Sequence, residues 1–348
     1  MLNNAYYELN PVLDNYSINV KNITVETLKP KKGVWWVDTD NGKYILKKVA
    51  VTKDKLLFLL SAITHLRANG VNIPSVHIAK DGNYFVEDGD KIYILMEAII
   101  GKPPSYTIPC ELAHIMQGMA TFHQASKNFI PPPEAKMRNH LGTWEKNYAQ
   151  QVADLEKYKE LALHDAEKSF EQFYLQDCDF FIAEGKACLQ ALKEPAYTNW
   201  VSKVRQEVNL CHQDFASGNL GLVTGTLYVY DMDSITFDLP ARDLRKIVNK
   251  VMKKRGQWDI DLTTQMFSSY QQINPLSGDE LKVVFIDIRF PHLFHGIASK
   301  YFENREQEWP SQKYLGRLEE MIKVEKAKGV ILEKQGDIIN SVLLVCNS

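Results

Sequence analysis

Residues 211–233 read CHQDFASGNLGLVTGTLYVYDMD, and their spacing decides how the whole chain is interpreted. Asp214 and Asn219 lie five residues apart across a loop that contains Gly218, so their side chains can converge on one point. Carboxylate and amide oxygens at such a point are the hard ligands that Mg²⁺ prefers.

A β-hairpin is predicted directly after this loop. Leu220–Val223 and Leu227–Tyr230 are apolar runs on either side of the turn pair Thr224-Gly225. Since antiparallel strands bring the chain back to the edge where it started, we expect Asp231 to join the two oxygen ligands of the preceding loop at a common cavity. The arrangement suits Mg²⁺ bound to phosphates.

Phosphoryl transfer requires such a set of groups. One carboxylate orients or deprotonates the acceptor hydroxyl, and the metal ligands neutralise the phosphate charge. A cation must also reach the α- and β-phosphates, and Lys47, central in a predicted strand, is the matching residue.

The first hundred residues are predicted to form mainly strands. The Asn41-Gly42 step favours a tight hairpin, and a helix is expected from the N-cap Thr52 to Asn69-Gly70. The expected strands are Val34–Val37, Lys43–Val49, Val76–Ala79, Tyr84–Glu87 and Lys91–Glu97.

The pattern changes at the break Gly101-Lys102-Pro103-Pro104. Helices are predicted beyond it, over Glu111–Ser126, within Gly142–Leu192, over Trp200–Leu210, and onward to about Gly329. The chain is therefore predicted to be an α+β protein with a β-rich lobe (1–99), a hinge (100–104) and a larger helical lobe (105–348) that carries the loop 211–233.

Composition excludes several classes of function. The 348 residues are 45% hydrophobic and 24% charged, with a formal charge of −2. The chain has no excess of basic residues, so its charge does not indicate binding to nucleic acid. The five cysteines have no zinc spacing, residues 1–16 show no signal peptide, and no apolar run is long enough to span a membrane. We expect a chain made in the cytoplasm.

The motif His212-x-Asp214-x-x-x-x-Asn219, followed by Asp231, resembles the catalytic and metal-binding loops of the aminoglycoside phosphotransferase and choline kinase branch of the protein-kinase-like fold. The stretch DLPARDL at 238–244 is similar to the helix-opening D-P-x-x-D-L pattern of that branch. More narrowly, the sequence HQDFASGNL at 212–220 resembles the corresponding segment of the CotS-type spore coat proteins. The resemblance implies a bilobal kinase-like fold, ATP and Mg²⁺ as cofactors, and a location in the spore coat.

The resemblance also implies residue roles. Asp214 becomes the catalytic base, Asn219 and Asp231 become metal ligands, and Lys47 becomes the lysine that contacts phosphate. His212 is expected to brace the loop.

Two further acids carry weaker expectations. Asp233 either assists the metal or is a solvated surface aspartate. Asp243 is expected to cap its helix and brace the catalytic loop rather than touch substrate.

The chain departs from the kinase pattern in two ways. It has no G-x-G-x-x-G, and the loop KPKKG at 29–33 contains a single glycine; its lysines either assist phosphate binding or are ordinary surface charge. The helix predicted to start at Thr52 contains no glutamate to pair with Lys47, and its only acid is Asp54 in the first turn. Lys47 is therefore expected to be loosely held, unless an acid from outside that helix pairs with it.

Two functions from different classes follow. The first is an ATP- and Mg²⁺-dependent phosphotransferase that acts on a hydroxyl of a small molecule or of a coat component. The second is a catalytically inactive kinase-like protein that serves as a structural or assembly component of the spore coat, with other coat proteins as partners.

Overall fold

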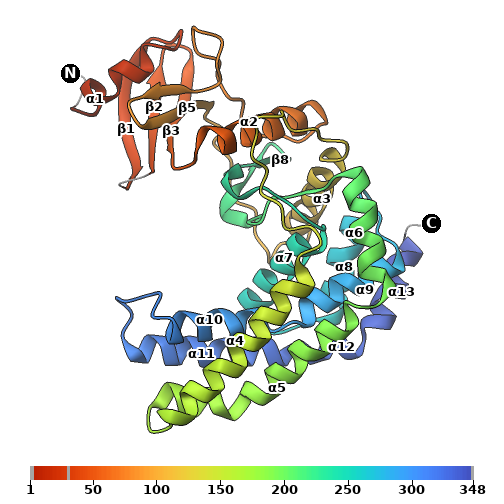
Figure 1. The fold of residues 1–348 in the computed structure, drawn as a ribbon. Coiled ribbons are helices and arrows are strands. Elements are labelled where there is room, and N and C mark those ends of the chain that lie inside the picture. Colours follow the sequence, from red (N-terminus) through yellow and green to blue (C-terminus); the bar gives the residue numbers. More distant parts are fainter. Residues whose placement is uncertain (1–3, 30–31, 346–348) are drawn as a thin grey trace. The chain divides into compact units, whose positions relative to one another are not determined.

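The computed structural model describes residues 4–29 and 32–345, which leaves Pro30, Lys31 and Cys346 outside the described chain. The chain forms two compact units (Figure 1). The sheet unit comprises Met1–Ser105, Phe129–Arg138 and Ser217–Ile235. The helical unit comprises Tyr106–Asn128, Asn139–Ala216 and Thr236–Ser348. No helix in the described residues combines the length and hydropathy that a membrane span requires.

The sheet unit is built on a five-stranded antiparallel sheet with the strand order β1-β2-β3-β5-β4. Its elements are α1 (Asn4–Leu13), β1 (Val20–Leu28), β2 (Gly33–Thr39), β3 (Gly42–Val49), α2 (Lys53–Ala68), β4 (Val86–Asp88) and β5 (Lys91–Glu97). The hairpin of β7 (Leu220–Val223) and β8 (Thr226–Val229), with the short 3₁₀ turns η1 (Ser217–Asn219) and η2 (Met232–Ser234), belongs to the same unit.

Alternating burial explains the central strands. Along β2, every second residue is buried, so Trp35 and Val37 enter one apolar cluster with Leu46 of β3 and Leu95 of β5. The turn between β2 and β3 lies at Asp40-Asn41, as the Asn-Gly step predicts. Two strands, β3 and β5, pair in the centre of the sheet and set Lys47 opposite Ile94.

Helix α2 follows its sequence signals closely. Thr52 occupies the N-cap position and Asn69 the C-cap position. Its apolar face packs Leu56 and Leu60 against Ile94 and Met96 of β5. This packing fixes the helix beside the strand that neighbours Lys47.

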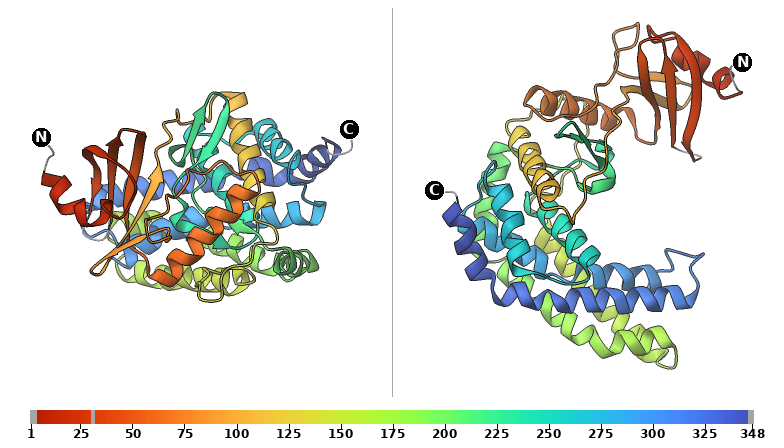
Figure 2. Two further views of the ribbon diagram at one scale, coloured as in Figure 1. Left: turned by 90° about the horizontal axis from the view of Figure 1, so that it is seen from above. Right: turned by 180° about the vertical axis from the view of Figure 1, so that it is seen from behind.

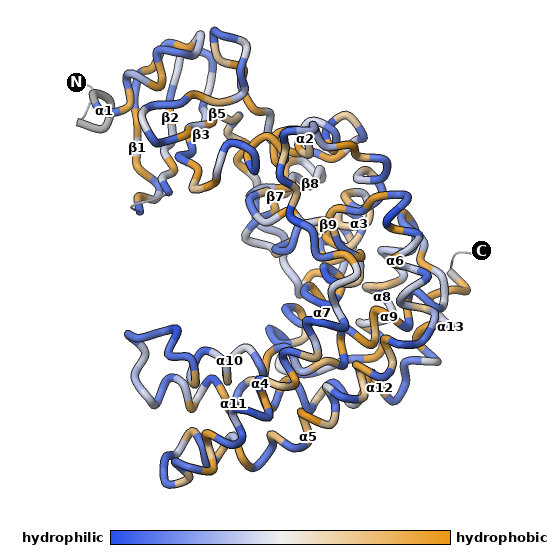
Figure 3. Tube along the Cα trace, viewed as in Figure 1, coloured by the Kyte–Doolittle hydropathy of each residue, from blue (hydrophilic) through white to orange (hydrophobic). Residues whose placement is uncertain are grey.

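The helical unit contains long amphipathic helices, and Figure 2 shows them from two further directions. Hydrophilic and hydrophobic residues alternate along its two longest helices, α4 and α5 (Figure 3). The helices are α3 (Pro109–Ala125), α4 (Trp144–His164), α5 (Ser169–Ala191), α6 (Pro195–Glu207), α7 (Ala241–Arg255), α8 (Ile260–Gln271), α9 (Gly278–Arg289), α10 (His292–Phe302), α11 (Ser311–Ala327), α12 (Gly329–Glu333) and α13 (Gln335–Val345). Two short strands, β6 (Leu210–Cys211) and β9 (Thr236–Phe237), pair with each other within this unit.

Some sequence-based predictions of elements were wrong. Val76–Ala79 is not a strand; Val76 forms a single bridge to Met96, because the segment runs beside β5 without continuing the ladder. The helix expected at Trp200–Leu210 is α6, which begins earlier, at Pro195, and ends at Glu207, so that Leu210 is free to pair in β6. Helices also continue to Val345, beyond the expected end at Gly329.

Candidate functional site

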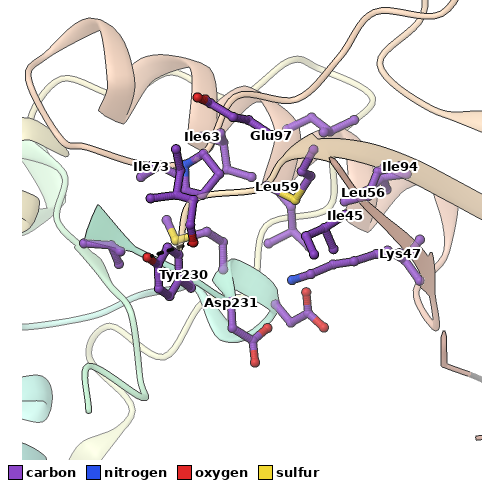
Figure 4. Close-up of a pocket in the computed structure, with 18 of the residues that line it drawn as sticks. Ile45, Lys47, Leu56, Leu59, Ile63, Ile73, Ile94, Glu97, Tyr230 and Asp231 are labelled. Atoms are coloured by element: carbon purple, nitrogen blue, oxygen red, sulfur yellow. Dashed lines mark hydrogen bonds between the residues drawn. The ribbon is translucent and has the colours of Figure 1, made fainter. Parts of the chain in front are cut away.

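Lys47 extends from the central strand β3 into a cavity of about 240 Å³ that lies within the sheet unit. Figure 4 shows its amine pointing toward the carboxylate of Asp231. The walls are mostly apolar and come from β3, α2 and β5, including Ile45, Leu56 and Ile94. An apolar cavity with one lysine and a carboxylate at its mouth is the usual form of a small-ligand site.

The hairpin β7–β8 brings Asn219 and Asp231 to one end. Leu220 pairs with Val229, and the Tyr230 amide donates a 2.9 Å hydrogen bond to the Asn219 carbonyl oxygen. Asp231 follows with φ 52°, in the left-handed region that non-glycine residues seldom adopt. Such a conformation is often kept where a side chain must be aimed at a ligand.

Asp233 also lines the cavity, and it has a cationic partner. Lys32, from the loop before β2, donates a 2.9 Å hydrogen bond to Asp233. This hydrogen bond, with further attraction from Asp233 and Asp231, raises the pKa of Lys32 above its ordinary value. The cavity mouth therefore carries two carboxylates and the ends of two lysines, Lys32 and Lys47.

No carboxylate of the described residues forms an ion pair with Lys47. Glu97, at the end of β5, lines the same cavity but accepts hydrogen bonds from the amide and hydroxyl of Ser75. Glu97 therefore does not replace the missing helix glutamate as a partner of Lys47. Sequence reasoning missed Glu97 because nothing in its strand pattern marks it as facing a cavity.

The predicted base, Asp214, belongs to the helical unit. Its carboxylate pairs with Lys250 of α7, and the preceding residue Gln213 has φ 73°. Lys246, one turn earlier on α7, donates to both the backbone and the side-chain oxygen of Gln213, at 2.7 and 2.8 Å. Two lysines of one helix face therefore hold the segment that carries Asp214. From the sequence, Lys250 was expected only to belong to a basic surface cluster, and Lys246 carried no signal.

Asp243 holds the backbone of this loop, as expected, but the prediction that it caps its own helix was wrong, because the N-cap residue of α7 is Pro240 and no described side chain caps this helix end. Its carboxylate accepts hydrogen bonds from the amides of His212 and Gln213, at 2.6 and 2.9 Å, and lies 3.3 Å from Nε2 of His123. Burial opposes its ionisation, but the His123 hydrogen bond and the charges of His212 and Lys246 lower the pKa of Asp243 below its ordinary value. Asp243 is therefore an ionised residue that holds the loop by hydrogen bonds, and His212 is buried as well.

Within the described residues, His123, Cys211 and Asp243 form a group whose ligand atoms lie close enough for one metal ion. The chemistry of the group does not suit a metal. Burial raises the pKa of the Cys211 thiol well above its ordinary value, and Sγ donates to the Leu239 carbonyl at 3.1 Å. Since a metal needs the thiolate, this cluster is a hydrogen-bonded brace.

The hard-oxygen set fits magnesium better. Asn219 and Asp231 share one end of the hairpin, and Asp233 lies two residues beyond. Amide and carboxylate oxygens are the donors that Mg²⁺ takes. The approach of Asp214 to these residues stays a prediction.

The comparisons with known proteins agree on one family. The family model described as "Spore coat putative kinase YutH" matches residues 12–335. Spore coat protein S of Bacillus subtilis (strain 168) is 31% identical over 331 residues, covering 95% of this chain and 94% of that protein.

Solved structures show the same fold. An aminoglycoside phosphotransferase from Alicyclobacillus acidocaldarius aligns with a TM-score of 0.81 at 17% identity, covering 95% of this chain and 96% of that one. The amicoumacin kinase hAmiN, in complex with AMP-PNP, Ca²⁺ and Ami, aligns with a TM-score of 0.64 at 15% identity over 93% and 94%. The fold predicted from residues 211–244 is confirmed as protein-kinase-like, with an antiparallel sheet and a larger helical part.

Proposed function

The chain belongs to the spore coat putative kinase YutH family, and on that premise we propose that it binds ATP with Mg²⁺ and transfers a phosphoryl group to a hydroxyl of a small molecule or coat component. Membership in the family assigns the protein to the spore coat. The observation that carries the proposal is the cavity of the sheet unit, in which Lys47 points toward Asp231.

The sheet unit supplies the nucleotide-binding groups. Lys47 contacts the phosphates, while Asn219 and Asp231 are the ligands that would hold Mg²⁺, with Asp233 as an accessory ligand. Bound Mg²⁺ supplies neutralisation of the phosphate charge. The apolar wall formed by Ile45, Leu56 and Ile94 excludes water from the ligand.

Asp214 supplies the base. It accepts the proton of the acceptor hydroxyl, and the loop that carries it is held by Asp243 and Lys246. Lys250 forms an ion pair with the Asp214 carboxylate. His212 is buried against the rings of Phe122 and Phe215, and its Nδ1 accepts a 3.3 Å hydrogen bond from the Asp214 amide, so it acts as a support of the loop.

Buried hydrogen bonds hold the loop that carries the proposed base. The carboxylate of Asp243 is buried, whereas the side chain of Asp214 is about half exposed. Burying a charge is costly unless hydrogen bonds satisfy it, and here the amides of His212 and Gln213 do so.

Thermal unfolding with ATP plus Mg²⁺, compared with ATP alone and Mg²⁺ alone, tests the proposal. We expect stabilisation only with the pair. Asp231→Ala should abolish the Mg²⁺-dependent part, whereas the control Asp90→Ala, an exposed turn residue of the same unit, should behave as wild type. Lys47→Ala should weaken binding modestly.

A second measurement separates binding from transfer. Asp214→Ala should retain the stabilisation by MgATP but lose phosphoryl transfer to the acceptor, because the base acts on the acceptor. Absence of any MgATP stabilisation in the wild-type protein would overturn the proposal and leave a kinase-like coat protein without nucleotide binding.

A further inference from the structure

A second cavity, of about 290 Å³, lies wholly within the helical unit. Its lining comes from α4, α7, α9, the start of α10, and His140 in the segment before α4. Unlike the cavity that holds Lys47, it is rich in polar side chains: Asn147, Gln151, Arg242, Arg245, Asp287 and His292. A cavity with convergent polar groups is a candidate ligand site.

The two arginines leave donors unused. Nε of Arg242 pairs with Asp238, and Nε of Arg245 lies 3.2 Å from Asp287. In the part of the chain that the structure describes, the terminal guanidinium nitrogens of both arginines have no protein acceptor. Their side chains are only 19% and 11% exposed, and both arginines line the cavity.

The carboxylate of this cavity is already satisfied. Asp287 accepts from Tyr148, from Nε2 of His292 at 2.7 Å and from Arg245, and its pKa lies far below the ordinary value despite burial. Burial, with the nearby Arg245, lowers the pKa of His292 to about 3, so the imidazole is neutral. The carboxylate of Asp287 is thus satisfied within the protein, whereas the arginines keep unused cationic donors.

Helix α7 connects this cavity to the predicted base. Arg242 and Arg245 alternate along the helix with Asp243 and Lys246, which hold the loop backbone next to Asp214. At 1.5 Å rise per residue, Arg245 and Lys250, the partner of Asp214, are separated by roughly 8 Å along the axis. At about 100° per residue the two side chains project about 140° apart, so α7 contributes to the cavity from one face and holds the loop that carries Asp214 from another.

We propose that this cavity binds the anionic group of the phosphoryl acceptor, a carboxylate or a phosphate, through Arg242 and Arg245. The planar guanidinium matches both anions in a two-pronged geometry. The amides of Asn147 and Gln151 on α4 provide hydrogen bonds for neighbouring hydroxyls. The inference rests on the proposed phosphotransfer and narrows its acceptor to a hydroxylated anion.

Three probes that share a glycerol skeleton test the inference: glycerol 3-phosphate, glycerate and glycerol. Calorimetric titration of each, without nucleotide or Mg²⁺, isolates the anion site. We expect one or both anions to bind and glycerol not to bind. The titrations with glycerol 3-phosphate and with glycerate show whether the site prefers a phosphate or a carboxylate. Equal behaviour of all three probes would overturn the inference.

Two variants locate the binding. The double variant Arg245→Gln, Asp287→Asn neutralises both partners of one ion pair. It should weaken anion binding about tenfold or more, because a charge-assisted hydrogen bond to the anion is lost. Gln151→Phe should block the cavity without touching either ion pair. The matched control is Arg289→Gln with Glu184→Gln, an arginine–carboxylate pair outside the cavity, which should bind anions as wild type does.

Lys47→Met separates this site from the nucleotide cavity. Anion binding that survives Lys47→Met and falls with the cavity variants supports the inference, and the reverse pattern overturns it. If the anion binds here but MgATP never stabilises the protein, the phosphotransfer proposal fails while the anion site stands. If MgATP stabilises the protein but no anion binds, only this inference fails.

Discussion

Lys32 Nζ donates a 2.9 Å hydrogen bond to the carboxylate of Asp233, although 201 residues separate the two in the chain. Both belong to the sheet unit, and Asp233 lies two residues after the predicted metal ligand Asp231. The loop whose lysines were expected either to assist phosphate binding or to be ordinary surface charge therefore reaches the mouth of the Lys47 cavity.

Lys32→Gln should lower the Mg²⁺ concentration that half-saturates the ATP-dependent stabilisation. An exposed ion pair contributes about 0–1 kcal/mol, so the change should be no more than about fivefold. Thermal unfolding across a Mg²⁺ series measures it. Lys43→Gln, which removes the exposed pair with Asp38 in the same sheet, is the control. A rise in the required Mg²⁺ would show instead that Lys32 contacts phosphate.

Asp243→Asn should destabilise the protein by about 1.5–3 kcal/mol, because the buried carboxylate accepts from two loop amides and an amide oxygen replaces it poorly. Urea unfolding measures the change. The exposed Asp261→Asn serves as control and should cost a few tenths of a kcal/mol at most. Equal effects of the two substitutions would contradict a bracing role for Asp243.

The lowered pKa of Lys246 predicts that the free energy of unfolding depends on pH. Burial, with the adjacent Arg245 and Arg242, lowers its pKa from 10.5 to about 8. Between about pH 8 and pH 10 the unfolded chain holds a proton that the folded protein has released, so this group makes stability rise with pH.

Lys246→Met should remove that contribution. The free energy of unfolding of the wild type, minus that of the variant, should rise by up to about 2 kcal/mol between about pH 8 and pH 9.5. Below pH 8 the difference should be flat. A difference independent of pH over the whole range would show that Lys246 titrates normally.

Gly101→Ala should destabilise the sheet unit by about 1–3 kcal/mol. A Cβ at Gly101 would lie 2.8 Å from the Cα and carbonyl carbon of Gly221, and this backbone contact accompanies the pairing of Lys102 with Leu222. Gly316→Ala in α11, where a Cβ meets open space, should instead stabilise by up to about 1 kcal/mol. Similar melting temperatures for both variants would exclude a close approach at Gly101.

The elements with local signals were predictable from sequence. The β2–β3 hairpin has its Asn-Gly turn, α2 has its cap and apolar spacing, and β7–β8 has Thr224-Gly225. Edge strand β1 was missed because Ile23 alone among its residues is buried, so no alternation marks it. Helix α1 was missed because Pro11 interrupts its sequence pattern.

The residues of the site also fall into those that could be predicted from sequence and those that could not. The acids of the site and Lys47 could be proposed from the sequence, because the spacing of the motif residues is visible there. Their cationic partners, Lys32 and Lys250, come from segments remote in sequence. Such pairings depend on tertiary packing, which no local pattern encodes.

One of the boundaries between the two units falls between Ala216 and Ser217, inside the motif that joins Asp214 to Asn219. The proposed nucleotide-holding groups thus fold with the sheet, and the proposed base folds with the helices. Mutational drift that erased Asp214 would leave the fold of the Lys47 cavity untouched. A descendant of such a protein could keep a nucleotide as a fixed structural component after losing turnover, so that the two properties have to be assayed separately in every member of the family.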